Sequence, residues 1–127
     1  MSIKRPLEPP HVEEEIEGAA HEVFRELGGS GYNEHVYQHA LRVELGMNGH
    51  TAECEVPVPI LYKGKHVGLG KIDLLVDGEV VVEVKAVQKL TPAMEAQLNA
   101  YLRARSAKLG VLVNFGVVVE CRFVNLE

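Results

Sequence analysis

Apolar residues recur at helical spacing in three parts of the chain. Residues 12–27 carry an apolar position every three or four residues, with glutamates near the start, and residues 33–47 repeat that spacing. Thr91 and Pro92 begin the third part, because a hydroxyl can cap a helix and a proline is tolerated in its first turn. The pattern therefore predicts three helices, two of them before any strand.

Strands are predicted where apolar and polar residues alternate. Residues 52–62 alternate in this way, but Pro57 and Pro59 cannot donate hydrogen bonds to a neighbouring strand, so this segment is expected at a sheet edge or a bulge. Further strands are expected at residues 66–76, at 79–86 and twice within 109–124, the last two joined near residues 114–116. This order of elements predicts an α/β fold with a central mixed sheet flanked by helices.

Length and composition indicate one folded domain. A chain of 127 residues with 46% hydrophobic and 24% charged side chains can bury a core. We expect residues 1–10 to be a flexible N-terminal segment and residues 11–127 to form the domain. No apolar run approaches the ~20 residues of a membrane helix, and no apolar export segment follows the N-terminus, so no membrane partner and a cytoplasmic location are expected. Cys54 and Cys121 have no nearby partner in the sequence and are expected to be free thiols.

Charge is distributed unevenly along the chain. The net charge of −5 argues against a protein that coats nucleic acid through bulk electrostatics. Residues 1–62 contain four Lys or Arg and eleven Asp or Glu, whereas residues 63–108 contain eight and five. The positive charge thus gathers in the second half, where it could face phosphate groups, although solvated surface charge is the commoner explanation.

The segment KIDLLVDGEVVVEVKA, residues 71–86, places charged side chains in an otherwise apolar hairpin. Glu83 and Lys85 lie two residues apart on one predicted strand and therefore share a face, while Asp73 comes from the other strand. Whether the three side chains meet depends on the turn between the strands.

Two registers of this hairpin are possible. A two-residue turn would pair Asp73 with Val82 and point it away from Glu83. A three-residue loop at residues 76–78, with its glycine in a left-handed bulge, would pair Asp73 with Val81 and place it on the face of Glu83. We predict the second register, because it completes a site.

A divalent metal ion would explain two carboxylates in a partly dry place. Without a cation, Asp73 and Glu83 would repel each other and one would take up a proton. Oxygen ligands suit Mg²⁺ or Mn²⁺ and leave coordination positions for water and phosphate oxygens. Lys85 beside the ion could orient an attacking water or stabilise charge on phosphorus, which indicates phosphodiester hydrolysis. An ordinary charged surface would show the same spacing.

Four sequence elements resemble a known group of enzymes. The stretch DLLVDGEVVVEVKA looks like the D…E-x-K core of the PD-(D/E)XK nuclease superfamily, with Ile72 in place of the proline, and GYNEHVY at residues 31–37 matches the motif of the GxxExxY protein family. QLNAY is similar to the superfamily's Q-x-x-x-Y helix, and GVLVNFG resembles its closing strand. The resemblance covers residues 12–124 and implies a restriction-endonuclease-like αβββαβ core in a single domain.

The resemblance also implies roles for individual residues. Asp73 and Glu83 would be metal ligands for Mg²⁺ or Mn²⁺, Lys85 the catalytic lysine, and Glu34 the carboxylate that a helix adds to the catalytic site. Gln97 and Tyr101 would contact nucleic acid, and helical spacing independently places these two on one face.

Two functions compete at this point. The first is a small Mg²⁺-dependent nuclease acting on nucleic acid, DNA more than RNA, with a homodimer or a protein partner needed for strong selectivity. The alternative is a catalytically inactive module of the same fold that binds nucleic acid or protein, which the acidic net charge favours.

Other polar residues are given structural interpretations. His35 and His39 are four apart on a helix but lack a third ligand at suitable spacing, so a surface position is preferred. Glu53 and Glu55 alternate with apolar residues and are expected on a solvated face, although one of them could approach the metal from the side.

Overall fold

The computed structural model describes residues 11–126, so the segment 1–10 that was expected to be flexible lies outside the described residues. The order of elements is the predicted one. The helices and strands are α1 (Val12–Leu27), α2 (Glu34–Met47), β1 (Ala52–Tyr62), β2 (Lys65–Val76), β3 (Val80–Lys85), α3 (Pro92–Arg105), β4 (Leu109–Phe115) and β5 (Val119–Asn125).

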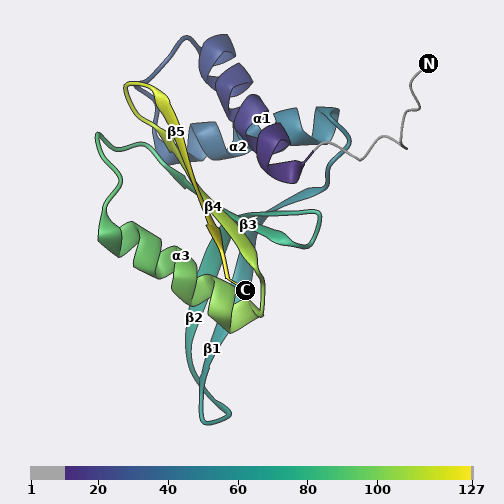
Figure 1. Cartoon of the computed structure of the whole chain (residues 1–127), viewed down its shortest axis with the longest axis vertical. Helices are drawn as coiled ribbons and strands as arrows, with labels where there is room; N and C mark the ends of the chain where they lie inside the picture. Colours follow the sequence, from purple (N-terminus) through teal and green to yellow (C-terminus); the bar gives the residue numbers. More distant parts are fainter. Residues whose placement is uncertain (1–10, 127) are drawn as a thin grey trace, which may run out of the picture.

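One five-stranded sheet organises the fold (Figure 1), with strand order β1-β2-β3-β4-β5. Neighbouring strands are antiparallel except β3 and β4, which are parallel and are connected through α3. Helices α1 and α2 pack on one face of the sheet, and α3 packs on the other. The predicted α/β fold with a central mixed sheet is therefore confirmed.

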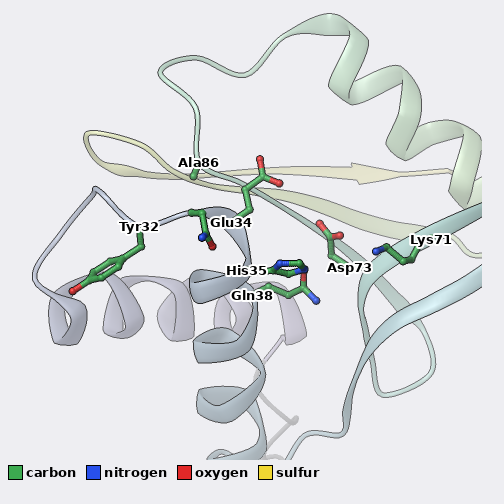
Figure 2. A pocket seen from close by; sticks show the side chains of 8 residues that line it. Tyr32, Glu34, His35, Gln38, Lys71, Asp73 and Ala86 are labelled. Atoms are coloured by element: carbon green, nitrogen blue, oxygen red, sulfur yellow. The ribbon is translucent and has the colours of Figure 1, made fainter.

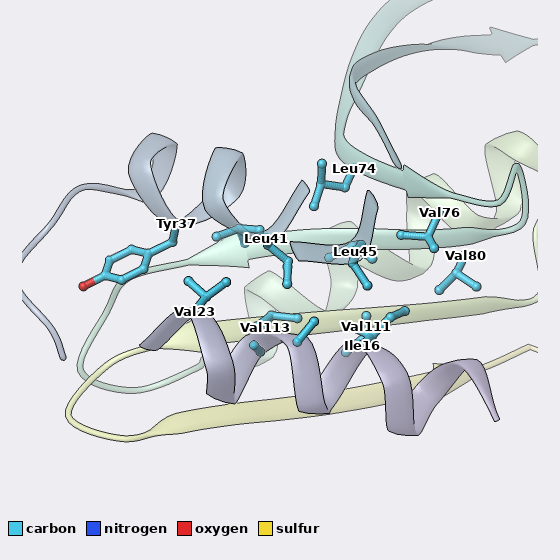
Figure 3. Packing of buried hydrophobic residues seen from close by; sticks show 14 of the residues in the cluster. Ile16, Val23, Tyr37, Leu41, Leu45, Leu74, Val76, Val80, Val111 and Val113 are labelled. Atoms are coloured by element: carbon cyan, nitrogen blue, oxygen red, sulfur yellow. The ribbon is translucent and has the colours of Figure 1, made fainter. Parts of the chain in front are cut away.

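The core consists of two apolar clusters separated by the sheet. Val80, Val82 and Val84 of β3 belong to the cluster under α1 and α2, part of which Figure 3 shows, whereas Val81 belongs to the cluster beneath α3. A strand covered on both faces needs an almost continuous apolar run, which β3 has apart from Glu83 and its last residue, Lys85. Within residues 11–126, no helix combines the length and apolarity needed to cross a membrane.

The motif around Glu34 fixes the beginning of α2. Gly31 adopts a φ of 123°, which favours glycine, and the Asn33 side chain then caps the helix by accepting from the Val36 N–H. Tyr37 is fully buried, stacks on Phe115 with ring centroids 4.5 Å apart, and donates its hydroxyl to a backbone carbonyl of the preceding loop at 2.8 Å. These contacts hold the first turn of α2, and with it Glu34, against the sheet.

Strand β1 is an edge strand, as its two prolines predicted. Glu55 has a φ of 56° and lies between Cys54 and Val56, which both pair with β2. Cys54 packs with the cluster under α1 and α2, whereas Val56 packs with the cluster under α3. The distal part of the hairpin therefore follows α3.

The predicted register of the hairpin between β2 and β3 is wrong by two residues. Val76 pairs with Val80, so the loop is 77–79 and not 76–78. Asp77 and Gly78 have φ of 54° and 70°, and the Glu79 N–H donates to the Val76 carbonyl at 3.0 Å, as in a two-residue type I′ turn. Glu79 is the additional residue that makes the loop odd, so Asp73 and Glu83 share a face after all.

Asn114 does not lie in the predicted turn between the last two strands. The residue is buried in β4, and the connection to β5 is made by residues 116–118. The Asn114 amide exchanges two hydrogen bonds with the backbone of Val87, at 3.0 and 2.9 Å. A residue that usually favours turns is held in the strand because its side chain satisfies backbone groups just after β3.

Gly70→Ala should destabilise the hairpin's contact with α3, whereas Gly68→Ala should not. A Cβ at Gly70 would come within 2.6 Å of the Tyr101 ring, but a Cβ at Gly68 would meet Ile60 at an ordinary 3.8 Å. We expect Gly70→Ala to lower the free energy of unfolding by about 1–3 kcal/mol, measured by denaturant titration. Equal stability of the two variants would show that the ring moves aside freely.

Candidate active site

The site forms where β2 and β3 separate. Backbone pairing between them ends at Leu74 and Val82, and the next position of each strand carries a carboxylate. Asp73 Oδ2 accepts from the Val84 N–H at 2.8 Å, and Glu83 Oε2 accepts from the Asp73 N–H at 3.1 Å. The two side chains thus replace the ladder hydrogen bonds that the strands lose.

This interlocked arrangement leaves one oxygen of each carboxylate for a ligand. Among the described residues, the hydrogen bonds of the pair use only Oδ2 of Asp73 and Oε2 of Glu83. Oδ1 of Asp73 and Oε1 of Glu83 remain without a hydrogen bond from residues 11–126. Two rigidly held carboxylates with spare oxygens are suited to bind a cation.

Burial makes a negative charge on this pair unfavourable. Glu83 is 4% exposed, and burial together with the Asp73 charge raises the pKa of Glu83 to about 8. The pKa of Asp73 is also raised, chiefly by burial and further by the charge of Glu34. The Lys85 ammonium lowers both pKa values without cancelling these effects. The pair therefore gains stability from any cation that binds it.

An open pocket of about 550 Å³ leads to Asp73 (Figure 2). Glu34 reaches it from the first turn of α2, and Lys71 reaches it from β2. The remaining lining residues are Tyr32, Asn33, His35, Gln38 and Ala86. The structure thus brings Glu34 and Asp73 to one pocket, although they are far apart in the sequence.

Lys85 follows Glu83 on β3 and is half-buried. Its charge acts on both Asp73 and Glu83, and it forms no salt bridge with any residue from 11 to 126. Its ammonium group is therefore not neutralised by a single carboxylate partner and can act on a bound anion.

Gln97 and Tyr101 are not among the residues that line this pocket. Gln97 is exposed on α3, and Tyr101 is half-buried against Gly70 of β2. The nucleic-acid contacts expected of the two residues stay a prediction.

Three charged or polar residues of this region were not assigned to the site from sequence. Glu55 of β1 lies opposite Asp73 of β2, between the pairs Cys54–Leu74 and Val56–Ile72. Its carboxylate is 3.4 Å from His35 Nε2 and 3.9 Å from Lys71 Nζ. His35 is exposed, as expected, but it lines the pocket. Glu55 has a φ of 56°, a backbone angle that strand alternation does not indicate.

Gln38 is the least expected residue of the pocket. Its side chain is 3% exposed, and within residues 11–126 its Nε2 has no hydrogen-bond acceptor. A buried donor without an acceptor costs about 1–3 kcal/mol, so a ligand oxygen or a water in the pocket would relieve it. Its place one turn after Glu34 on α2 is the sequence signal that could have indicated it.

The donor set fits a divalent cation that retains other ligands. Among residues 11–126, no three His, Cys, Asp or Glu side chains are grouped as a complete metal site. Asp73 and Glu83 offer two anionic oxygens, and Mg²⁺ is commonly held by one or two carboxylates together with waters and phosphate oxygens. Such an ion would compensate the negative charge that burial makes unfavourable on this pair.

Comparisons with known proteins identify a superfamily and a similar fold. A family model described as the PD-(D/E)XK nuclease superfamily matches residues 10–124. A search of curated proteins found no match. Among solved structures, the crystal structure of SSO0001 is similar with a TM-score of 0.52 and 18% sequence identity, over 91% of this chain and 78% of that one. At this identity the similarity concerns the fold alone.

Proposed function

Because this chain belongs to the PD-(D/E)XK nuclease superfamily, we propose that it is a metal-dependent nuclease that hydrolyses phosphodiester bonds. In this proposal DNA is preferred to RNA as the substrate. The observation that carries the proposal is the interlocked pair of Asp73 and Glu83, whose ionised form is unfavourable without a cation. The match of GYNEHVY to the GxxExxY motif supports a place in that branch of the superfamily.

In this proposal Asp73 and Glu83 hold Mg²⁺ or Mn²⁺ through their spare oxygens. The ion, when bound, would polarise the phosphate and stabilise the charge that develops on it. Lys85 contributes a positive charge beside the pair, where it orients a water and stabilises negative charge on the phosphate oxygens. Its lack of a carboxylate partner among the described residues supports this role.

The α2 side of the pocket supplies the complementary groups. Glu34 presents an exposed carboxylate that can accept a hydrogen bond from the water. Gln38 can donate its unpartnered Nε2–H to a phosphate oxygen, which would satisfy a buried donor at the same time. Gln97 and Tyr101 on α3 complete the proposal as contacts to the nucleic acid.

In this proposal the described residues form a single nuclease domain. A homodimer or a protein partner would allow cleavage of two strands, because the chain presents one such carboxylate pair within residues 11–126. The cytoplasmic location stays a prediction from the sequence.

The second candidate is a catalytically inactive binding module of the same fold. The net charge of −5 favours this module in its protein-binding form, because an acidic protein is repelled by nucleic acid at long range. The intact set of Asp73, Glu83 and Lys85 favours the nuclease, since a pure binding module has no need of a buried carboxylate pair.

A cleavage assay on a panel of nucleic acids separates these functions. Purified protein would be incubated with single- and double-stranded DNA and RNA in Mg²⁺, Mn²⁺ or EDTA. We expect cleavage with either ion and none with EDTA. Metal-independent cleavage, or no cleavage of any substrate in either ion, would contradict the nuclease proposal.

A further inference from the structure

We propose that the distal part of the hairpin of β1 and β2, residues 57–71, is an arm that binds the backbone of a duplex nucleic acid beside the active site. The inference rests on the proposed function for the kind of ligand, but it concerns a surface apart from the carboxylate pair. In a chain with a net charge of −5, this segment contains Lys63, Lys65 and Lys71 and no Asp or Glu. The arm is therefore a positive projection on an acidic molecule.

The arm extends away from the body of the protein. In Figure 1 the hairpin continues past α3 and ends in a free tip. Lys63 and Gly64 form the tip, with φ of 49° and 78°, and join Tyr62 to Lys65 in a tight two-residue turn. Such a narrow two-stranded ribbon can enter a groove of a duplex, since the major groove admits a β-ribbon.

One face of the arm is fixed and the other is uncovered. The inner face packs on α3 through buried Val58 and through Gly70, which lies against Tyr101. On the other side, Leu61 and Leu69 are 61% and 65% exposed. The arm is thus held in place by α3 while its outer surface is available to a ligand.

The outer face leads directly into the catalytic pocket. Leu69 and Lys71 are two residues apart on β2 and share a face, and Lys71 lines the pocket together with Asp73. From Lys71 to Lys65 the strand spans about 20 Å, the length of about six base pairs. A duplex with one phosphate in the pocket could therefore reach the lysines of the tip.

Charge favours a nucleic acid over a second copy of the chain on this surface. In a symmetric contact between the tips of two arms, Lys63 and Lys65 of both copies would approach each other, which is unfavourable. Phosphates complement these lysines, and the exposed Tyr62 ring beside Lys63 offers an apolar surface to sugars or bases. The uncovered apolar side chains then contact the groove walls.

Binding can be measured without cleavage. Fluorescence anisotropy of a labelled DNA duplex, in EDTA and at several salt concentrations, would compare the wild type with Lys63→Asn/Lys65→Gln. Asparagine is chosen at position 63 because it tolerates the positive φ of the turn. The matched control is Lys89→Gln/Lys108→Gln, which removes two exposed lysines elsewhere.

We expect the arm variant to bind the duplex about 10- to 100-fold more weakly at moderate salt, with a salt dependence smaller by about two counterions. The control should change affinity much less. Equal losses in both variants, or no loss in the arm variant, would overturn the proposal, as would dissociation of a dimer by the arm substitutions with unchanged duplex binding.

The test also separates the arm from the proposed activity. Arm-dependent binding by a protein that cleaves nothing would support the arm and contradict the nuclease. Metal-dependent cleavage with a KM that the arm substitutions leave unchanged would support the nuclease and contradict the arm.

Discussion

Lys85→Ala is expected to reduce metal-dependent cleavage by a factor of about 10² or more while metal binding persists. The substitution removes a positive charge that acts on the phosphate in the transition state, and losing one such electrostatic stabiliser has an effect of this size. Metal affinity should be unchanged or higher, because a cation near Asp73 and Glu83 has gone. Single-turnover cleavage and calorimetric titration with Mn²⁺ measure the two effects separately.

The metal ligands should behave differently from the lysine. Asp73→Asn and Glu83→Gln each remove a negative charge and an anionic oxygen with little change of shape, so cleavage should be lost and metal binding weakened. Lys108→Ala is a control for the loss of an exposed positive charge outside the pocket. Cleavage that survives in Lys85→Ala would belong to another site or to a contaminant.

The sequence predicted the elements of this fold well because periodicity reports burial directly. The valines of β3 and the amphipathic spacing of α1 indicate what each element covers, and the prolines of β1 indicate an edge. Boundaries were accurate where a cap marks them, as Asn33 and Thr91 do for α2 and α3. Each of these signals depends only on residues that are close together in the sequence.

The register of the hairpin could be predicted only in part. The requirement that Asp73 and Glu83 share a face predicts an odd loop, and the loop is odd. It does not decide between registers that differ by two residues, since both keep the same alternation. That choice follows from the type I′ turn at Asp77 and Gly78 and from the apolar contacts of the valines that it pairs.

The contacts of two polar residues near the site could not be predicted from local patterns. Glu55 follows the alternation of an exposed strand residue, yet it has a positive φ and lies near His35 and Lys71. In the sequence, Asn114 resembles a turn residue. In the structure, the parallel pairing of β3 and β4 brings it beside Val87, with which it forms hydrogen bonds. In both cases the deciding contact comes from a segment distant in the sequence.

The carboxylate pair should also make the metal-free protein less stable as pH rises. Glu83 holds its proton up to a pKa of about 8 in the folded state but only to about 4.5 when unfolded. The folded state therefore binds more protons between these values, and stability falls as pH rises through that range. The full shift corresponds to about 5 kcal/mol.

Glu83→Gln should remove most of this loss, because glutamine cannot ionise. Denaturant unfolding in EDTA would be measured at about pH 5 and about pH 9 for both proteins. We expect the variant to gain several kcal/mol relative to wild type between the two pH values. His50, whose pKa is raised mainly by its hydrogen bond to Asp77, also loses its stabilising effect as pH rises, but it does so in both proteins and cancels.

Metal should restore the stability that the wild type loses at high pH. Mg²⁺ or Mn²⁺ binds the ionised pair in the folded state and should therefore stabilise wild type more at about pH 9 than at about pH 5, whereas Glu83→Gln should respond little at either pH. Parallel stability curves for the two proteins in EDTA would mean that water reaches Glu83 and that its ionisation costs little. In that case the carboxylate pair would have no particular need of a cation, and the observation on which the nuclease proposal rests would be lost.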